Sequence, residues 1–309
     1  MAPQFNKITI IGLGLIGSSL ARAARKSGVA AMLVGVDLDP AVCKRAEELN
    51  FADKITRDPV AGVQGSDLII IAVPVGRYHE LAKQIGPHLK AGAVVTDVGS
   101  VKQAVVEAVA PVLPSSVHFV PAHPVAGNEK SGPDAGLADL FEGRWAILTP
   151  SADTDLKAIE KVTAFWESCG AVIEIMEPAH HDLILAITSH LPHLIAYTVV
   201  DTASQLEDDI TAEVIKFSAG GFHGFTRTAA SDPTMWRDVF LNNREAVLEI
   251  LQRFTEDLTA MQKAIRRGDG DFLFDTFTRT RAIRRKHTEL GAAAYPSPEL
   301  SVEDISKGK

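Results

Sequence analysis

Residues 120–129 read VPAHPVAGNE, so one histidine stands between two prolines and just before a polar loop that contains a glycine. A neutral imidazole with a pKa near ~6.5 can accept a proton at neutral pH, which makes His123 a candidate general base. Pro124 biases His123 toward an extended backbone, and the apolar residues before it are typical of a short strand. We therefore expect His123 just past a strand end, where open α/β sheets bind ligands.

A second group of histidines occupies residues 189–193, which read SHLPH. His190 and His193 are three residues apart and share one face of a predicted helix. Pro192 cannot donate to the carbonyl of Thr188, so we expect a kink there. The pair is either the wall of a pocket or two hydrogen-bonded core histidines. Residues 180–182, HHD, could bind a metal, but adjacent helical side chains diverge, and no metal site is predicted.

One arginine lies in a glycine-rich stretch, residues 219–236, which we expect to be a flexible loop. The guanidinium of Arg227 could hold a carboxylate with two hydrogen bonds. The local pattern favours a surface salt bridge over that role, and both readings stay open at this point. Asp232 followed by Pro233 predicts the start of a helix.

A glycine-rich turn, GLGLIG at residues 12–17, follows an apolar strand and opens a helix. Gly12 permits the turn, Gly14 lets a pyrophosphate approach, and Gly17 lets helix and strand pack closely. Asp37 ends the next predicted strand, where a carboxylate can bind the ribose hydroxyls, and no arginine follows it, which favours NAD over NADP. The cofactor residues predicted from the turn and strand ends are Gly12, Leu13, Gly14, Leu15, Ile16, Gly17, Asp37, Val73 and Pro74. Asp39 could cap the helix after it. Ser100 could cap a helix or face the cleft.

The elements that must position these residues alternate between short apolar strands and helices in the first half of the chain. This order predicts an α/β domain, a Rossmann-type doubly wound parallel sheet. The expected strands are Ile8–Gly12, Met32–Asp37, Leu68–Val73, Ala93–Asp97, His118–Val120, Trp145–Thr149 and Val172–Ile175. The expected helices between them are Leu15–Ser27, Pro40–Leu49, Val75–His88 and Lys102–Val109.

From Ala179 onward the pattern is helical, and it predicts an all-α C-terminal domain. The expected helices are His180–Gln205, Thr211–Ala219, Pro233–Arg266 as one long helix, and Phe272–Leu290. Long helices with large apolar faces favour a homodimer formed through this domain. The predicted organisation is a dinucleotide-binding domain over 1–177, a helical substrate and dimerisation domain over 178–290, and a mobile tail over 291–309.

Composition excludes some classes of function. The 309 residues are 46% hydrophobic and 23% charged, with a formal net charge of −8. This acidic balance argues against nucleic-acid or membrane partners. The N-terminus lacks the layout of a signal peptide, no apolar run of membrane-spanning length is expected, and two distant cysteines suit a reducing compartment, so a cytoplasmic location is expected.

Taken together, the motifs resemble the prephenate/arogenate (cyclohexadienyl) dehydrogenases of tyrosine biosynthesis. The stretches that carry the resemblance run in the family's order and cover the chain to about Leu290. They are 12–17, DVGSVK at 97–102, HPVAG at 123–127 with EKSG at 129–132, SHLPH at 189–193, and FTRTA at 225–229 with DPTMW at 232–236.

The resemblance implies a two-domain dimer that uses NAD, with the active site in the cleft between the domains. It matches His123 to the catalytic histidine, Ser100 to a serine near the ring hydroxyl, and Arg227 to the arginine that holds a substrate carboxylate. His193 matches a substrate-contacting histidine of prephenate users, and His190 is its neighbour in the motif. Glu129 matches an acid at the mouth of the site that can pair across the cleft. Gly224 stands where some relatives carry an acid, which puts any gating pair between loops in doubt.

The reaction that the resemblance implies is an oxidative decarboxylation of prephenate or arogenate, with His123 accepting the proton of the ring hydroxyl. Two alternatives stay open at this point. One is another β-hydroxyacid-type dehydrogenase, although those rely on a catalytic lysine and Lys216 lies in no matching motif. The other is a non-enzymatic NAD-binding regulator, which would bind NAD and reduce none.

Overall fold

The structure is a computed structural model that describes residues 3–205 and 220–294, with side chains described as far as residue 286. Its internal contacts divide the chain into two units, residues 1–250 and 251–309. Every residue proposed above for chemistry belongs to the first unit, so their mutual positions can be compared.

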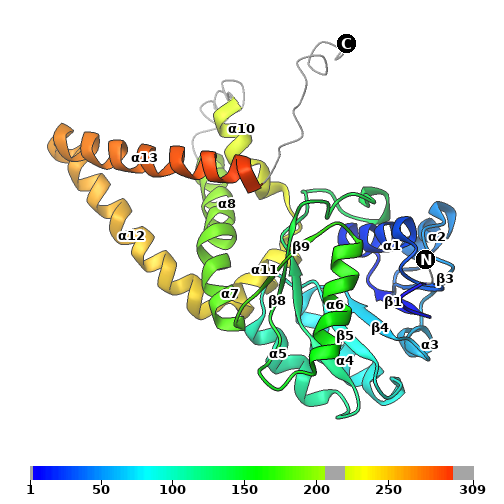
Figure 1. The fold of residues 1–309 in the computed structure, drawn as a ribbon. Coiled ribbons are helices and arrows are strands. Elements are labelled where there is room, and N and C mark those ends of the chain that lie inside the picture. Colours follow the sequence, from blue (N-terminus) through cyan, green and yellow to red (C-terminus); the bar gives the residue numbers. More distant parts are fainter. Residues whose placement is uncertain (1–2, 206–219, 295–309) are drawn as a thin grey trace. The chain divides into compact units, whose positions relative to one another are not determined.

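The first unit is built on a six-stranded parallel sheet with the order β3-β2-β1-β4-β5-β6. Among these strands, Figure 1 labels β3, β1, β4 and β5. Its strands are β1 (Ile8–Ile11), β2 (Leu33–Val36), β3 (Lys54–Thr56), β4 (Leu68–Ile71), β5 (Val94–Asp97) and β6 (His118–Val120). The order reverses direction between β1 and β4, which is where sheets of this kind bind a nucleotide. The predicted doubly wound sheet is confirmed. The short strand β3 was not predicted.

Side chains that alternate along the central strands pack into two separate apolar cores, one on each face of the sheet. Ile8 and Ile10 of β1 pack into a core with α1 (Leu15–Ser27) and α6 (Leu156–Ser168), whereas Ile11 packs into a second core with the helices of the other face. Those helices are α3 (Pro59–Val63), α4 (Tyr78–Ile85) and α5 (Gln103–Val109). Since both faces are covered, the strands are apolar throughout, as the sequence indicated.

A second, three-stranded sheet corrects the sequence-based prediction. It has the order β7-β8-β9, formed by β7 (Ala122–Pro124), β8 (Trp145–Leu148) and β9 (Val172–Ile175). The chain leaves β6 at Val120 and, one residue later, pairs antiparallel with β8, so that His123 lies opposite Ile147. His123 is therefore inside a strand rather than just past one. The extended backbone expected from Pro124 is correct, but its pairing partner lies too far along the chain to be read locally.

The predicted helix over 180–205 is one continuous stretch with a widened turn inside it. It consists of α7 (Pro178–Leu185), a π-turn over Ala186–His190, and α8 (Leu191–Ser204). The backbone N–H of Leu191 donates to the carbonyl of Ala186, five residues back. Pro192 follows at once, and its missing N–H and ring bulk disfavour a regular α-turn there. The irregularity expected at Pro192 thus takes the form of a π-turn.

Two further helical predictions were wrong in detail. The glycine-rich stretch is not a loop in its described part, because α10 (Gly220–Thr226) and a 3₁₀ turn over Arg227–Ala230 occupy it. The expected single helix over 233–266 is divided at Asn243 into α11 (Pro233–Asn242) and α12 (Arg244–Arg267). The predicted helix over 211–219 lies outside the described residues.

In the second unit, α13 (Gly270–Ala294) corresponds to the helix predicted over 272–290. It includes the first residues of the expected mobile tail, whose remainder, 295–309, lies outside the described residues. No strand follows β9 within the described ranges.

The stretch from Pro178 to Ser204 also corrects the statement that no apolar run reaches membrane-spanning length. It is 27 residues long with a mean hydropathy of 1.6 in its most apolar part. Length and composition alone do not separate a spanning helix from a core helix of a globular protein. This helix carries three buried polar residues, His181, Asp182 and His190, each hydrogen-bonded to protein groups, which favours the core helix.

Candidate active site

The glycine-rich turn has the geometry of a dinucleotide cradle. Gly12 has a φ of +98°, and a side chain there would overlap the backbone of Ala72 at the end of β4. A side chain at Gly17 would overlap the carbonyl of Gly12, whereas nothing lies within 4 Å of the position of a side chain at Gly14. The open side of the turn is therefore at Gly14. The helix begins at Leu15 with no side-chain cap, so its first N–H groups are free for an anionic group.

Asp37 lies directly beside this cradle. One of its carboxylate oxygens accepts the N–H of Leu13 at 2.9 Å, and the other accepts the N–H of Asp39 at 3.0 Å. These contacts fix the carboxylate at the end of β2 while leaving lone pairs for ribose hydroxyls. Asp39 caps α2 (Pro40–Leu49), as the sequence allowed.

The neighbouring strand end carries the other two residues predicted to bind the cofactor. Val73 and Pro74 follow β4 and lead into a 3₁₀ turn over Val75–Arg77. Ser100 is half-buried and does not cap a helix, because α5 begins at Gln103 with Lys102 at its N-cap position. Of the two readings of Ser100, capping is therefore wrong. No hydrogen bond joins Ser100 to His123 in the described part of the chain.

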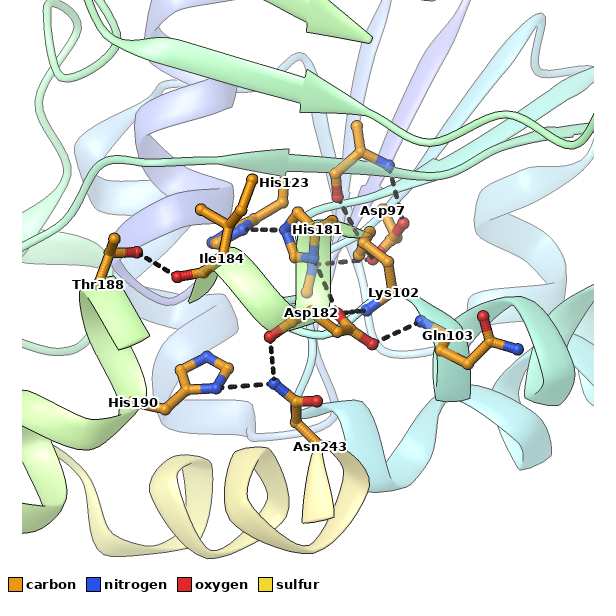
Figure 2. Close-up of polar contacts among 12 residues, drawn as sticks. Asp97, Lys102, Gln103, His123, His181, Asp182, Ile184, Thr188, His190 and Asn243 are labelled. Atoms are coloured by element: carbon orange, nitrogen blue, oxygen red, sulfur yellow. Dashed lines mark hydrogen bonds and ion pairs between the residues drawn. The ribbon is translucent and has the colours of Figure 1, made fainter. Parts of the chain in front are cut away.

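His123 is buried, with 7% of its surface exposed, and its ring contacts a second imidazole. Nδ1 of His123 lies 2.8 Å from Nε2 of His181, and Nδ1 of His181 lies 2.8 Å from Oδ1 of Asp182 (Figure 2). Burial lowers the pKa of His123 well below 6.5, and the nearby His181, Lys102 and His190 lower it further. The imidazole is neutral at neutral pH, with a pKa below the ordinary value expected from the sequence.

A buried ion pair holds the backbone beside His123. Nζ of Lys102 donates to Oδ2 of Asp97 and to the carbonyl of Ala122, while the N–H of Ala122 donates to Oδ1 of Asp97 (Figure 2). Both ionic side chains are fully buried. Desolvation lowers the pKa of Lys102, and the carboxylate of Asp97 opposes that effect. Both polar groups of Ala122 are thus satisfied by one pair, which positions the start of β7.

Asp182 ties α7 to the start of α5. Its two carboxylate oxygens accept the N–H groups of Lys102 at 2.7 Å and Gln103 at 2.9 Å. Its backbone carbonyl accepts from Nδ2 of Asn243. The same amide nitrogen lies 3.0 Å from Nδ1 of His190. Asn243, which separates α11 from α12, therefore binds both α7 and the π-turn that follows it.

The two histidines of the SHLPH motif have different surroundings. His190 is fully buried, its Nε2 has no hydrogen-bond partner, and desolvation lowers its pKa to about 4. His193 is half-buried, donates from Nδ1 to the carbonyl of Ser189, and stacks on Trp236 with ring centroids 3.7 Å apart. Trp236 also contacts His190 edge-on, and its indole N–H is buried without a partner. Of the two, His190 is a core histidine with one hydrogen-bonded ring nitrogen, whereas His193 is partly exposed.

Arg227 pairs with Glu129. Nη1 of Arg227 lies 2.5 Å from Oε2 of Glu129, and the two side chains are 57% and 33% exposed. Arg227 is close enough to His193 to lower the pKa of that imidazole, although desolvation is the larger cause. A pair involving Glu129 therefore forms without an acid at Gly224.

Several residues of this network had no predicted role. They are Asp97, Lys102, His181, Asp182, Asn243 and Trp236. His181 and Asp182 had been considered only as metal ligands, and no group of three or more His, Cys, Asp or Glu side chains suited to a metal occurs in the described ranges. The available signal was two ionisable residues at the start of a helix that begins with Pro178, but their partners lie about sixty to eighty residues earlier in the chain.

Comparisons with known proteins cover most of the chain. The family model described as "Prephenate dehydrogenase, nucleotide-binding domain" matches residues 20–175, and that described as "Prephenate dehydrogenase, dimerization domain" matches residues 177–279. A cyclohexadienyl dehydrogenase of Zymomonas mobilis is 41% identical over 91% of this chain and 95% of its own length. A prephenate dehydrogenase of Bacillus subtilis is 33% identical over 90% of this chain and 75% of its own length.

A solved structure agrees with these relatives. The crystal structure of prephenate dehydrogenase from Aquifex aeolicus, in complex with hydroxyphenyl propionate and NAD+, is 35% identical in sequence. It superposes with a TM-score of 0.84 over 91% of this chain and 98% of that chain.

Proposed function

The chain belongs to the prephenate dehydrogenase family, and we propose how its own side chains divide the work of the family's reaction. The protein is an NAD-dependent prephenate/arogenate dehydrogenase, an oxidoreductase of tyrosine biosynthesis. The reaction oxidises the ring carbon that bears the hydroxyl and releases the ring carboxylate as CO2. The protein must therefore remove one proton, hold the carboxylates and align the ring.

We assign to His123 the role of accepting the proton of the substrate's ring hydroxyl. Its ring is neutral at neutral pH, because burial and the neighbouring His181, Lys102 and His190 depress its pKa. Its Nδ1 is engaged by His181, which leaves Nε2 for the hydroxyl of the substrate. Proton transfer by a positioned base contributes about 10²- to 10⁴-fold to a rate. This single observation, a buried neutral imidazole with one nitrogen held and the other available, carries the proposal.

The remaining predicted residues take roles in binding. We propose that Arg227 binds a substrate carboxylate in place of Glu129, its present partner. His193, stacked on Trp236 near Arg227, contacts the substrate, and His190 lines the wall behind it. We assign Ser100, which is partly buried, to contact with the ring hydroxyl, as the family resemblance implies.

The cradle described above fits NAD. The open side at Gly14, the free N–H groups at the start of α1 and the carboxylate of Asp37 suit a pyrophosphate and a ribose, and we assign Gly12 to Gly17, Asp37, Val73 and Pro74 to this role. When bound, the oxidised nicotinamide supplies the hydride acceptor.

The test of the base is His123→Asn. The variant should lose at least about 10²-fold in kcat with prephenate and bind NAD, measured by calorimetry, as the wild type does. Full turnover by the variant would refute the role of His123. Initial rates of NADH formation by the wild type, measured separately with prephenate and with arogenate, show which substrate is preferred.

We also propose a homodimer formed by the helical part of the chain, in the cytoplasm. The 178–204 helix exposes Leu183, Ile187 and Val200, and its most apolar segment is only 28% buried in the single chain. A second copy would cover such a surface. Sedimentation analysis giving a monomer at micromolar concentration would contradict the dimer.

The proposed domains are 1–177 and 178–290, a division supported by the junction of the two family matches. The proposed cytoplasmic location is supported by the two cysteines, which are free and buried, as suits a reducing compartment.

A further inference from the structure

The role proposed for His123 requires one particular tautomer. If Nε2 is to accept the substrate proton, the ring proton of neutral His123 must be on Nδ1. In the opposite tautomer, Nε2 carries the proton and cannot act as a base. The two tautomers of a free imidazole interconvert readily, so something in the protein must select between them.

The hydrogen bonds leading away from His123 make that selection. The carboxylate of Asp182 receives backbone N–H groups on both of its oxygens, at 2.7 and 2.9 Å, so it acts as an acceptor. It can bond to Nδ1 of His181, 2.8 Å away, only if that nitrogen carries the proton. Nε2 of neutral His181 is then an acceptor, and its contact with His123, also at 2.8 Å, requires a proton on Nδ1 of His123.

We propose that His181, held by Asp182, is a positioning residue that fixes His123 in its proton-accepting tautomer. The proposal rests on the assignment of His123 as the base. His181 acts only through His123, and the bonds run in one direction along the chain of rings, from Nδ1 of each imidazole to the next acceptor (Figure 2).

The same arrangement stabilises the product of proton transfer. When Nε2 of His123 takes the proton, the ring becomes a cation that still donates from Nδ1 to His181. The Asp97–Lys102 pair is neutral overall, wherever its shared proton lies. Asp182 is therefore the charge in this network that is left to oppose the new cation, and the ring of His181 connects the two.

The rigidity of the arrangement supports a positioning role. His181 is fully buried and Asp182 is 4% exposed. The rings of His123 and His181 meet edge to face, with centroids 5.1 Å apart at 73°. The anchors of Asp182 on Lys102 and Gln103 belong to the segment that also supports Ala122, the neighbour of His123. Residues 102–103 therefore hold both rings in place, that of His181 through Asp182 and that of His123 through Ala122.

Two substitutions of His181 separate orientation from other roles. The side-chain amide in His181→Gln can accept from His123 and donate to Asp182, but it does not take up a proton. His181→Leu removes both hydrogen bonds. His180→Leu is the matched control, because His180 is the exposed neighbour on the same helix. All three are compared with the wild type in kcat, KM and NAD affinity.

We expect His181→Leu to lose about 10²-fold or more in kcat with NAD affinity unchanged. His181→Gln should retain kcat within about tenfold of the wild type, and His180→Leu should match the wild type. Full kcat in His181→Leu would overturn the proposal. Equal losses of kcat in the Gln and Leu variants would also overturn it. The hydrogen bonds kept by the amide would then have no effect, so His181 would act through its shape or through proton sharing and not by orienting His123.

A direct measurement does not depend on any variant at position 181 folding. In the wild-type protein with ¹⁵N-labelled histidine, the ring nitrogens report the tautomer, and His123→Asn identifies the signal of His123 by its loss. The proposal requires a protonated Nδ1 and an unprotonated Nε2 in His123, and the opposite assignment overturns it. If instead His123→Asn turns over fully, the base assignment fails while the tautomer result stands, so the two failures can be told apart.

Discussion

The guanidinium of Arg227 is paired with the carboxylate of Glu129, two residues that are 98 positions apart in the chain. The side chain proposed to bind a substrate carboxylate is thus already bound to a carboxylate of the protein. We propose that the substrate carboxylate takes the place of Glu129 at Nη1 of Arg227.

Glu129→Gln should therefore lower KM for prephenate without changing kcat. Both side chains are partly exposed, so the pair contributes only about 0.2–1 kcal/mol, and KM should fall by up to about fivefold. Steady-state kinetics at low ionic strength measures this effect. Glu142→Gln, which breaks the surface pair with Lys26, is the control and should leave KM unchanged. An increase in KM for Glu129→Gln would mean that Glu129 helps to bind the substrate.

Asp37→Asn should weaken the preference for NAD over NADP. The amide oxygen can still accept the N–H of Leu13, as Asp37 does at 2.9 Å, so the turn is kept while the negative charge is removed. Charges about 4 Å apart repel by about 1–4 kcal/mol near a protein surface, so the ratio of kcat/KM for the two cofactors should fall at least about fivefold. An unchanged ratio would show that another group excludes the 2′-phosphate.

The pH dependence of kcat/KM should follow the depressed pKa of His123. Burial is the largest cause of that depression, with His181, Lys102 and His190 adding to it. Because the base is active when unprotonated, activity should stay on its plateau below pH 6.5 and fall only as pH drops through the lowered value. Initial rates in buffers from pH 4 to pH 8 test this. An acid limb centred at or above pH 6.5 would contradict it.

Folding stability should also decrease in acid because of the buried histidines. The folded pKa of His190 is about 4, below an unfolded value of about 6.5. Below about pH 6.5 the unfolded chain binds more protons than the folded one, so the free energy of unfolding falls as pH drops toward 4. His190 alone would account for about 3 kcal/mol of this loss.

Chemical unfolding at pH 7 and pH 4.5 measures that loss. His190→Gln should reduce the difference between the two pH values, whereas His180→Gln, at an exposed site, should not. Equal pH dependence in the wild type and His190→Gln would show that His190 is not the group responsible.

The cofactor half of the site could be predicted from the sequence because its determinants are local. The glycines at 12, 14 and 17 and the acid at the end of β2 lie within one strand–helix–strand unit. The strand His118–Val120 and the helix Leu15–Ser27 were predicted with the observed bounds. Short elements with weak patterns escaped. Lys54–Thr56 is too short to show alternation, and Ala122–Pro124 contains a proline that argues against a strand.

The catalytic half could be predicted only in part, because it is assembled from distant segments. His123 is recognisable by its prolines, but its partner His181 is 58 residues away and belongs to a helix. Asn243 joins Asp182 and His190 across 61 and 53 residues, and no local pattern singles it out. The division between α11 and α12 at this residue was missed for the same reason, since the apolar periodicity continues across it.

The widened turn at Ala186–His190 makes the length of this helix as critical as its composition. His181 lies before that turn and His193 after it, and each is bound to a different part of the protein. Removing one residue from the turn would rotate everything beyond it by about 100° relative to what comes before. A one-residue deletion there would leave His181 against His123 and turn His193 to another face of the helix, so the length of this turn sets the angle between the two imidazoles.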